Sequence, residues 1–419
     1  MRTKMILILL AAVTAGAADK VPIPGLLQLA RSAPHSPAFR EALVATLGQA
    51  EIRKGVAFAG EGPDFLWAVE SEKAPTLYVD DQPAPGKMRR VNSSQVWFQL
   101  GTLQTGASHR FHYLVDGARF GGRNDVPAFG ADSYEKPGVP QGKLSDKLTH
   151  TSRIYDGMTS DYWIYVPAQY DASHAACLMV WQDGRGFTER NGASRLQNVT
   201  DNLIHQKKIP VMIHVLIDPG LIGERRMRSI QYDTVTDRYA HFLRDEILPE
   251  VYQKYNLRRD PYSRGIAGQS SGGICAFNVA WQQPDQFSRV LSRIGSYTSI
   301  QWKPNELDGG QSYPNKVRKE PKRNLRVWLD DGSEDLENDH GSWPLQNIQM
   351  ANSLKFKGYD FHFSFGSGTH STAHGNAELP AALAWLWRDY DPSKTEQTYE
   401  QDPAERAKSL FRVKIYNRD

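Results

Sequence analysis

Residues 265–273 have the composition and spacing of a turn that presents a serine nucleophile. They read Gly-Ile-Ala-Gly-Gln-Ser-Ser-Gly-Gly and contain Gly268-x-Ser270-x-Gly272. In this G-x-S-x-G pattern a strand turns sharply into a helix, and the glycines let neighbouring backbones approach without a Cβ clash. The preceding residues 264–267 are short enough for a buried strand, and the apolar stretch 274–281 is typical of a helix. We therefore predict that Ser270 is a nucleophile.

A serine hydroxyl is a weak nucleophile at neutral pH. It needs an imidazole to accept its proton, a carboxylate to orient that imidazole, and N–H donors for the oxyanion. An acid-rich loop, residues 330–335, follows a predicted strand that ends at Leu329. We favour Asp335 as the catalytic acid because it lies a short turn beyond the strand. Asp331 and Glu334 are the alternatives.

Two histidines follow the last predicted strand, residues 359–365. His370 comes after a glycine-rich turn, and His374 comes one helical turn later. The chain order serine, acid, histidine is that of an α/β-hydrolase, in which each group lies on a loop at the carboxyl end of a strand. We predict that His370 is the base and assign His374 to the substrate pocket or to structural hydrogen bonding.

The remaining site residues follow from fold position. We expect the oxyanion hole to use the backbone N–H of Ser271 and that of Gly184, in the loop after the predicted strand 177–181. Asp183 of the same loop is a candidate for substrate binding. So is Arg226, from a polar loop expected to overhang the site and either to bind an acidic or catechol-like substrate or to be solvated. That loop contains Arg225, Arg226, Arg228 and Tyr232.

Two metal sites are alternatives to this interpretation. His370-x-x-x-His374 has the spacing of two zinc ligands on a helix but lacks the glutamate of H-E-x-x-H and follows glycines. The alternating acids of residues 331–339 resemble a calcium loop, but Leu336 stands where an EF-hand requires glycine and Ser342 where it requires glutamate. We predict no metal and no cofactor.

The elements that must position these groups begin at Thr151. From there strands alternate with helices, which predicts a mostly parallel sheet covered on both faces, an α/β-hydrolase domain over residues 151–392. Within the helical segment 237–255, Pro249 is expected to bend or shorten the helix. The expected strands are 152–155 paired with 162–166 in a hairpin, then 177–181, 211–217, 264–267, 289–295, 325–329 and 359–365.

A second domain is predicted upstream, since 419 residues exceed a usual single domain. Residues 55–120 alternate strands with turn signals, which favours a small immunoglobulin-like β-sandwich. Residues 19–54 are expected to form a helical connector, 121–150 an interdomain linker and 393–419 a charged peripheral tail. We assign the aromatic side chains of the sandwich to its core, with a sugar-stacking face as the alternative; they are Trp67, Tyr78, Trp97, Phe111 and Tyr113.

The first residues predict export. Arg2 and Lys4 precede an apolar run, residues 5–13, and small residues follow it, which is the pattern of a cleaved signal peptide over residues 1–18. We therefore expect a secreted or periplasmic protein. The apolar run is too short to span a bilayer, and no other stretch approaches the ~20 residues that a spanning helix needs.

Composition narrows the class further. The chain is 40% hydrophobic, which is enough for a real core, and its net charge of +3 comes without a basic run of the kind that binds nucleic acid. Cys177 and Cys275 are the only cysteines, so a disulfide scaffold is excluded. We expect two packed thiols, with one bridge between them as the alternative. The sequence does not predict an oligomeric state.

With these motifs in place, the chain resembles the enterochelin (ferric siderophore) esterase branch of the α/β-hydrolases. The wider group includes feruloyl and acetyl-xylan esterases of carbohydrate esterase family 1. The resemblance implies that Ser270 is the nucleophile and His370 the base. Tyr297, which lies in one of the matching pieces, is a further candidate for substrate binding. A β-sandwich ahead of the hydrolase domain is also this branch's layout. The matching pieces are residues 180–184, 268–273, 294–297, 331–335 and 368–370.

Two departures bear on the substrate. Enterobactin-cleaving members usually carry Gly-Gly-His followed by Asp-Trp, whereas this chain has Gly-Thr-His370-Ser-Thr-Ala-His374. Those enzymes are also often cytoplasmic, whereas an export signal is predicted here. We therefore favour an exported serine ester hydrolase that forms an acyl-enzyme on small-molecule or glycan-linked feruloyl or acetyl esters. The alternatives are a ferric-siderophore trilactone esterase and a non-catalytic glycan- or siderophore-binding protein.

Overall fold

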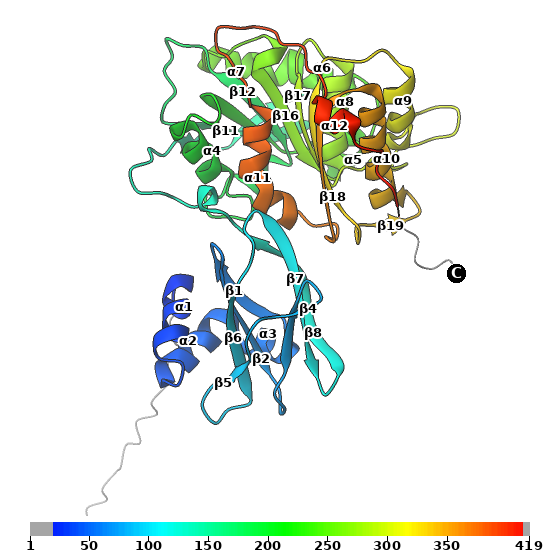
Figure 1. Cartoon of the computed structure of the whole chain (residues 1–419). Helices are drawn as coiled ribbons and strands as arrows, with labels where there is room; N and C mark the ends of the chain where they lie inside the picture. The colour runs from blue at the N-terminus through cyan, green and yellow to red at the C-terminus, as the bar shows by residue number, and fades with distance from the viewer. Residues whose placement is uncertain (1–19, 414–419) are drawn as a thin grey trace, which may run out of the picture. The chain divides into compact units, whose positions relative to one another are not determined.

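The computed structural model describes residues 20–413, so the predicted signal peptide, residues 1–18, lies outside the described residues. Within residues 20–413, no helix is both long and apolar enough to cross a membrane. The chain divides into two compact units (Figure 1). Among the described residues, the first unit comprises 20–103 and 110–123, and the second comprises 104–109 and 124–413.

The first unit is built on two four-stranded sheets, ordered β1-β2-β6-β5 and β4-β3-β7-β8. Two of its hairpins turn through consecutive residues with positive φ, Asp80-Asp81 and Asp116-Gly117. This is the backbone of a type I′ turn, whose twist matches that of the flanking strands. The strands are β1 Ala57–Glu61, β2 Asp64–Glu70, β3 Thr76–Val79, β4 Gln82–Pro83, β5 Arg89–Arg90, β6 Val96–Thr102, β7 Ala107–Val115 and β8 Ala118–Ala128.

An aromatic layer joins these two sheets. Phe111 of β7 meets Phe58 of β1 and Trp67 of β2 edge to face, with ring centroids 6.0 and 6.5 Å apart. Trp67, Phe111 and Tyr113 are buried, as we predicted for core aromatics. The other two aromatics are only partly buried. Tyr78 stacks on His112, and Trp97 lies under the guanidinium of Arg90. That this unit has an immunoglobulin-like fold stays a prediction.

Three helices cover the sheet β1-β2-β6-β5: α1 (Ile23–Ser32), α2 (Pro37–Leu47) and α3 (Gln49–Lys54). The start of α2 follows from its sequence, because the Ser36 hydroxyl accepts a hydrogen bond from the Phe39 N–H at 3.1 Å. Gly48, with φ of 81°, ends the helix. The apolar side chains of the three helices share one core with the sheet, so the segment expected as a connector is part of this unit's packing. They include Leu26, Leu27, Ala30, Phe39, Leu43 and Ile52.

The second unit is built on a mixed sheet, ordered β15-β14-β11-β13-β12-β16-β17-β18-β21, with β9 and β10 paired to β11. The run from β13 to β21 is parallel, and the strands on the other side are antiparallel. The strands are β9 Lys143–Leu144, β10 Leu148–Thr151, β11 Thr159–Val166, β12 Cys177–Gln182, β13 Met212–Ile217, β14 Leu221–Ile222, β15 Arg225–Arg226, β16 Arg264–Gln269, β17 Arg289–Arg293, β18 Arg326–Gly332 and β21 Asp360–Gly366.

The opening hairpin of this sheet differs from the prediction. Strand β11 pairs with β10 in the register Thr151↔Thr159, so residues 152–155 form a turn and are not a strand. The Glu246 carboxylate explains the difference, because it accepts hydrogen bonds from the backbone N–H of Arg153 at 2.9 Å and of Ile154 at 3.1 Å. A buried carboxylate thus takes the donors that a strand would have used.

Helices cover both faces of the parallel strands (Figure 1). Alternate residues of β12 serve opposite cores: Leu178 and Val180 join one, and Met179 and Trp181 join the other. One core takes side chains from α4 (Leu196–His205) and α11 (Ala373–Leu386). The opposite core takes them from α5 Arg228–Tyr232, α6 Arg238–Phe242, α7 Leu248–Lys254, α8 Ser271–Gln282, α9 Tyr313–Lys319 and α10 Trp343–Lys357. A short helix, α12 (Pro403–Ala407), lies in the tail.

The helical segment around Pro249 is interrupted, as predicted. A π-helical turn, η3 (Leu243–Ile247), separates α6 from α7, and Pro249 lies in the first turn of α7. Proline has no N–H and its ring crowds the carbonyl four residues earlier, here that of Asp245. The wider π turn relieves that crowding.

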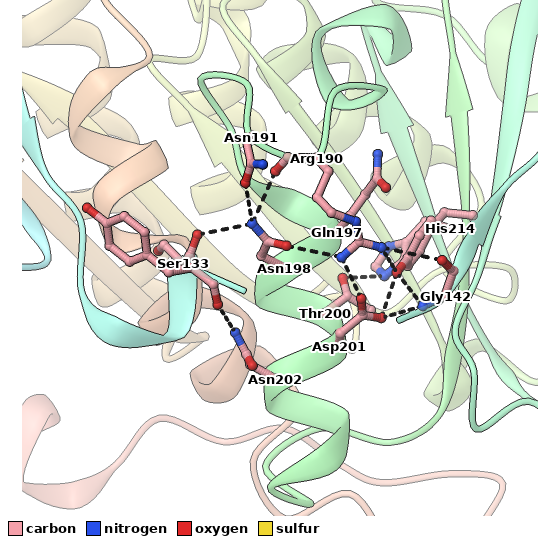
Figure 2. A network of polar contacts seen from close by, with 12 residues as sticks. Ser133, Gly142, Arg190, Asn191, Gln197, Asn198, Thr200, Asp201, Asn202 and His214 are labelled. Atoms are coloured by element: carbon pink, nitrogen blue, oxygen red, sulfur yellow. Dashed lines mark hydrogen bonds and ion pairs between the residues drawn. The ribbon is translucent and has the colours of Figure 1, made fainter. Parts of the chain in front are cut away.

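The predicted linker is fastened to α4 by polar side chains (Figure 2). After β8 it forms a 3-10 turn, η1 (Ala131–Ser133). The Asn202 amide donates to the carbonyls of Asp132 and Tyr134 at 2.9 and 2.7 Å. Farther along, the Asp201 carboxylate accepts from the Gly142 N–H at 3.2 Å. The polar face of α4 is therefore buried by this segment.

Asp201 is the centre of that network, so we expect Asp201→Ala to lower the free energy of unfolding by about 3–5 kcal/mol. Its carboxylate also accepts from the Tyr165 hydroxyl at 2.6 Å and pairs with Arg190 at 2.8 Å, and the substitution leaves that half-buried cation unpaired. Urea unfolding followed by tryptophan fluorescence measures the change. Asp339→Ala is the control, because Asp339 is 88% exposed and should shift stability by less than about 0.5 kcal/mol. Equal shifts would contradict the network's role.

Candidate active site

The turn between β16 and α8 carries Ser270 in a strained backbone conformation. Its φ of 58° and ψ of −125° are rarely adopted by residues other than glycine. The Ser270 N–H donates to the Arg293 carbonyl at 2.9 Å, which ties the turn to the neighbouring strand β17. A Cβ built on Gly268 would lie 2.0 Å from the Gly272 carbonyl oxygen. The chain can therefore fold back on itself here only with a glycine at position 268.

Three of the predicted residues form one hydrogen-bonded line. His370 Nε2 lies 2.8 Å from Ser270 Oγ, and His370 Nδ1 lies 2.5 Å from Asp335 Oδ1. The Asp335 side chain is buried and also accepts from the Leu336 N–H at 2.5 Å. Of the three acids that the sequence left open, Asp335 is the one that contacts His370. Glu334 instead accepts a hydrogen bond from Asn124.

The loops that carry the acid and the histidine are joined because their strands are neighbours. Strands β18 and β21 are parallel and in register, with Gly332 opposite Gly366. Beyond the strands, the Ser333 N–H donates to the Gly366 carbonyl at 2.9 Å, and the Glu334 N–H donates to that of Gly368 at 3.0 Å. The carboxyl ends of two adjacent strands thus deliver Asp335 and His370 to one place.

Two residues that the sequence analysis did not assign to the site lie beside it. The Trp343 ring, at the start of α10, packs edge to face on the His370 imidazole with centroids 5.7 Å apart. Its indole N–H donates to Ser296 Oγ at 3.2 Å, and that oxygen lies 3.5 Å from Ser270 Oγ. No local motif marks Trp343, because its site contacts are all distant in the sequence. Ser296 appeared only within one of the matching pieces.

The carboxyls of Asp331 and Asp335 differ in charge. Burial, reinforced by the neighbouring Asp335 carboxyl, raises the pKa of Asp331 well above its usual value. Burial also opposes the charge of Asp335, but hydrogen bonds from His370, Asp331 and the Leu336 N–H bring the pKa of Asp335 below its usual value. At neutral pH, Asp335 is therefore charged and Asp331 is neutral. A charged Asp335 holds the proton of His370 on Nδ1, which leaves Nε2 free to accept one from Ser270.

Both predicted oxyanion donors begin helices. Ser271 is the first residue of α8, and Gly184 is the first residue of the 3-10 turn η2 (Gly184–Phe187). The N–H of a first helical residue has no acceptor within its own helix. A Cβ on Gly272 would lie 3.0 Å from both Gln182 Cβ and Asp183 Oδ2, so the loop after β12 packs against the start of α8. This packing brings the segments that contain the two N–H groups together.

The substrate-binding candidates of the neighbouring loops have different environments. Arg228 donates to both carboxylate oxygens of Asp183 at 2.7 Å. Burial alone would lower the pKa of Arg228, but this bidentate pair raises it. Arg228 also reaches the Gln269 carbonyl at 3.4 Å, so the pair braces the residue before Ser270. Arg226 lies on β15 and is exposed.

Tyr297 and His374 make contacts away from Ser270. Tyr297 is fully buried and donates to Ser292 Oγ at 2.9 Å, inside the core behind the turn. His374 Nε2 lies 3.0 Å from Ser364 Oγ and 3.1 Å from Glu378 Oε1. Burial would lower the pKa of His374, but the carboxylate of Glu378 raises it. These contacts fit the structural alternative for His374.

The described part of the chain has no set of ligands for the zinc or calcium site considered above. Across residues 20–413, no three or more His, Cys, Asp or Glu side chains are grouped so that they could hold a metal ion. Cys177 and Cys275 are both free and buried.

Comparison with known families identifies the group to which this site belongs. Residues 158–386 match the family described as "Putative esterase", and this span is more than half of the chain. The chain belongs to this esterase family. The matched span contains all of Ser270, Asp335 and His370.

Curated relatives of the esterase carry several names. An iron(III) enterobactin esterase of Dickeya dadantii is 24% identical over 263 residues, which cover 59% of the chain and 54% of that protein. The iron(III) enterobactin esterase of Escherichia coli K12 is 27% identical over a stretch that covers 43% of the chain and 41% of that protein. An endo-1,4-beta-xylanase/feruloyl esterase of Xylanibacter ruminicola is 24% identical over a stretch that covers 61% of the chain and 36% of that protein. The chain thus spans about half, or less, of the length of these relatives.

Solved structures share the esterase's fold. The enterobactin esterase from Shigella flexneri in the presence of enterobactin gives a TM-score of 0.54 at 18% identity, covering 84% of this chain and 98% of that one. Ferric enterobactin esterase from Salmonella typhimurium gives a TM-score of 0.52 at 17% identity, covering 78% of this chain and 93% of that one. With the family match, these likenesses show an α/β-hydrolase-like fold with a mixed sheet, which is the fold class that we predicted.

The close approach at Gly268 makes a substitution there informative. We expect Gly268→Ala to destabilise the esterase by about 1–3 kcal/mol or more, because the added methyl meets backbone that cannot move aside cheaply. Gly186→Ala is the matched control, since nothing lies within 4 Å of a Cβ built there. Differential scanning fluorimetry compares the two melting temperatures. Similar melting temperatures would show that the turn tolerates a side chain at position 268.

Proposed function

We propose that the esterase is a serine carboxylic ester hydrolase in which Ser270 is the nucleophile, His370 the general base and Asp335 the acid that orients it. The single observation that carries the proposal is the continuous line of hydrogen bonds from Asp335 through His370 to Ser270. This is the arrangement that activates a serine hydroxyl. Membership of the esterase family supports the same reaction class.

The reaction follows from this geometry. Ser270 Oγ attacks the ester carbonyl carbon while His370 Nε2 takes the hydroxyl proton, and the carbonyl oxygen becomes an oxyanion. The N–H groups of Ser271 and Gly184 donate to it. The oxyanion then collapses, the bond to the leaving alcohol breaks, and His370 returns its proton to that alcohol. Water, deprotonated by His370, then hydrolyses the acyl-enzyme and restores Ser270.

We further propose that the substrate is an extracellular ester, feruloyl or acetyl, on carbohydrate or a similar molecule. The predicted export signal and the departure from the enterobactin-cleaving histidine loop support this choice.

The domain organisation belongs to the same proposal. A hydrolase domain over residues 151–392 holds all three site residues, and a β-sandwich over residues 55–120 precedes it.

A ferric-siderophore trilactone esterase is the second candidate function. The names of the curated relatives favour it, as does the structural match that covers 98% of an enterobactin esterase chain. A non-catalytic binding protein is less favoured, because it would have no reason to keep a buried Asp335, an oriented His370 and a strained Ser270 in register.

Single substitutions test the proposal with p-nitrophenyl acetate as substrate. We expect Ser270→Ala and His370→Ala to lower kcat/KM at least about 10³-fold, because each removes a group that acts directly in bond making or proton transfer. His374→Ala is the matched control, another imidazole of the same segment, and should retain activity within about tenfold. Wild-type activity in Ser270→Ala, or equal losses at His370 and His374, would contradict the assignment.

A substrate panel separates the candidate functions. Methyl ferulate, acetylated xylan and ferric enterobactin are compared by kcat/KM with the wild type and Ser270→Ala. Preference for the carbohydrate-type esters by tenfold or more supports the favoured substrate, and the reverse preference supports the siderophore candidate. Binding of one of these molecules without turnover of any would favour the binding protein.

A further inference from the structure

A second buried acid, Asp331, lies against the catalytic acid candidate. Asp331 is 3% exposed, at the end of β18, and its carboxyl is close enough to that of Asp335 for the two to affect each other's ionisation. One oxygen of Asp331 accepts from the Gly332 N–H at 2.8 Å. One oxygen of Asp335 accepts from both His370 and the Leu336 N–H. Each carboxyl therefore has one oxygen engaged by N–H donors.

The other two oxygens raise a problem of charge. If both groups were ionised, Oδ2 of Asp331 and Oδ2 of Asp335 would each be buried without a donor. Two adjacent carboxylates would also repel each other in a site with little water to screen them. A single proton solves both problems, because a neutral acid donates a hydrogen bond to the free oxygen of its charged neighbour.

The surroundings decide which acid holds the proton. The imidazole of His370, which lies in the loop before α11, faces Asp335. Asp335 Oδ1 accepts from His370 Nδ1 and from the Leu336 N–H. Asp331 has one N–H donor and lies next in sequence to Asp330, whose own partner is Arg293 of β17 at 3.6 Å. On the other side, β21 places Phe365, which cannot titrate, in register with Asp331. The groups around Asp331 thus favour its neutral form, and those around Asp335 favour its charged form.

We propose that Asp331 is a positioning residue: as a neutral acid it donates a hydrogen bond to the free oxygen of Asp335 and holds that carboxylate charged and directed at His370. This inference rests on the proposed function, since Asp331 acts only through Asp335 and His370. Two carboxyls therefore act together: Asp335 contacts His370, and Asp331 contacts Asp335 but not the histidine.

The pH dependence of stability gives a test that does not need activity. Burial beside Asp335 raises the pKa of Asp331 well above that of an unfolded aspartate, which loses its proton near pH 4. Above pH 4 the folded state therefore holds one proton more than the unfolded state at this position, until Asp331 ionises in the folded protein. Over that range the stability contributed by Asp331 falls as the pH rises. An amide, which never ionises, removes that dependence.

Two substitutions separate the donor from the packing. Asn at position 331 keeps an N–H that can donate to Asp335 and an oxygen that can accept from Gly332, whereas leucine of similar size keeps neither. We expect kcat for p-nitrophenyl acetate to be about 10- to 100-fold lower in Asp331→Leu than in Asp331→Asn, which is the range for a hydrogen bond to a charged group. Equal rates in the two variants would overturn the proposal.

The melting temperature provides the second readout and uses Asp331→Asn alone, so it holds even if the leucine variant does not fold. The excess of its melting temperature over that of the wild type should grow by at least about 3 °C between pH 5 and pH 9. Asp339→Asn, an exposed control, should show no such trend. An excess that stays flat with pH would overturn the proposal. A fully active Ser270→Ala would instead refute the proposed function and leave the stability result unaffected.

Discussion

The strained turn at Ser270 is the constraint on which the rest of the site depends. A positive φ at a serine persists only when surrounding contacts fix it. Here Gly268 allows the backbone to double back, Gly272 allows the loop after β12 to pack against the start of α8, and the carbonyl of Arg293 accepts from the Ser270 N–H. The turn places the hydroxyl beyond the end of β16, in the middle of the sheet, and starts α8 with a free N–H. The proposed nucleophile and one proposed oxyanion donor thus come from one local geometry.

The second requirement is one negative charge, held beside the imidazole and out of water. Parallel register between β18 and β21 brings the acid and histidine loops together. The shape of the loop alone does not set the charge, because Asp331 is buried in it as well as Asp335. Hydrogen-bond donors favour the ionised form of Asp335, and burial favours the protonated form of Asp331. On this account the site requires both carboxyls, Asp331 and Asp335, and one proton, which Asp331 holds.

The sequence predicted what is encoded locally or by chain order. Ser270 follows from glycine spacing, and His370 from its place after the last strand. Asp335 was favoured, but Asp331 and Glu334 stayed open as alternatives, because the choice among the three depends on burial and on donors from other segments. The expected strand 152–155 was wrong for a similar reason, since Glu246, far along the chain, binds its N–H groups. Contacts between distant residues, such as those of Trp343 with the site or Arg228 with Asp183, have no local signature that sequence reasoning can read.

The most direct test of the account is to label the wild-type esterase with a fluorophosphonate, which phosphonylates an activated serine, and to locate the adduct by peptide mass spectrometry. The account predicts one stoichiometric adduct on the peptide that contains Ser270. The adduct should be absent from Ser270→Ala and should form far more slowly in His370→Ala, because the hydroxyl is then no longer activated. An adduct at another serine, or labelling of Ser270 at the same rate without His370, would contradict the account.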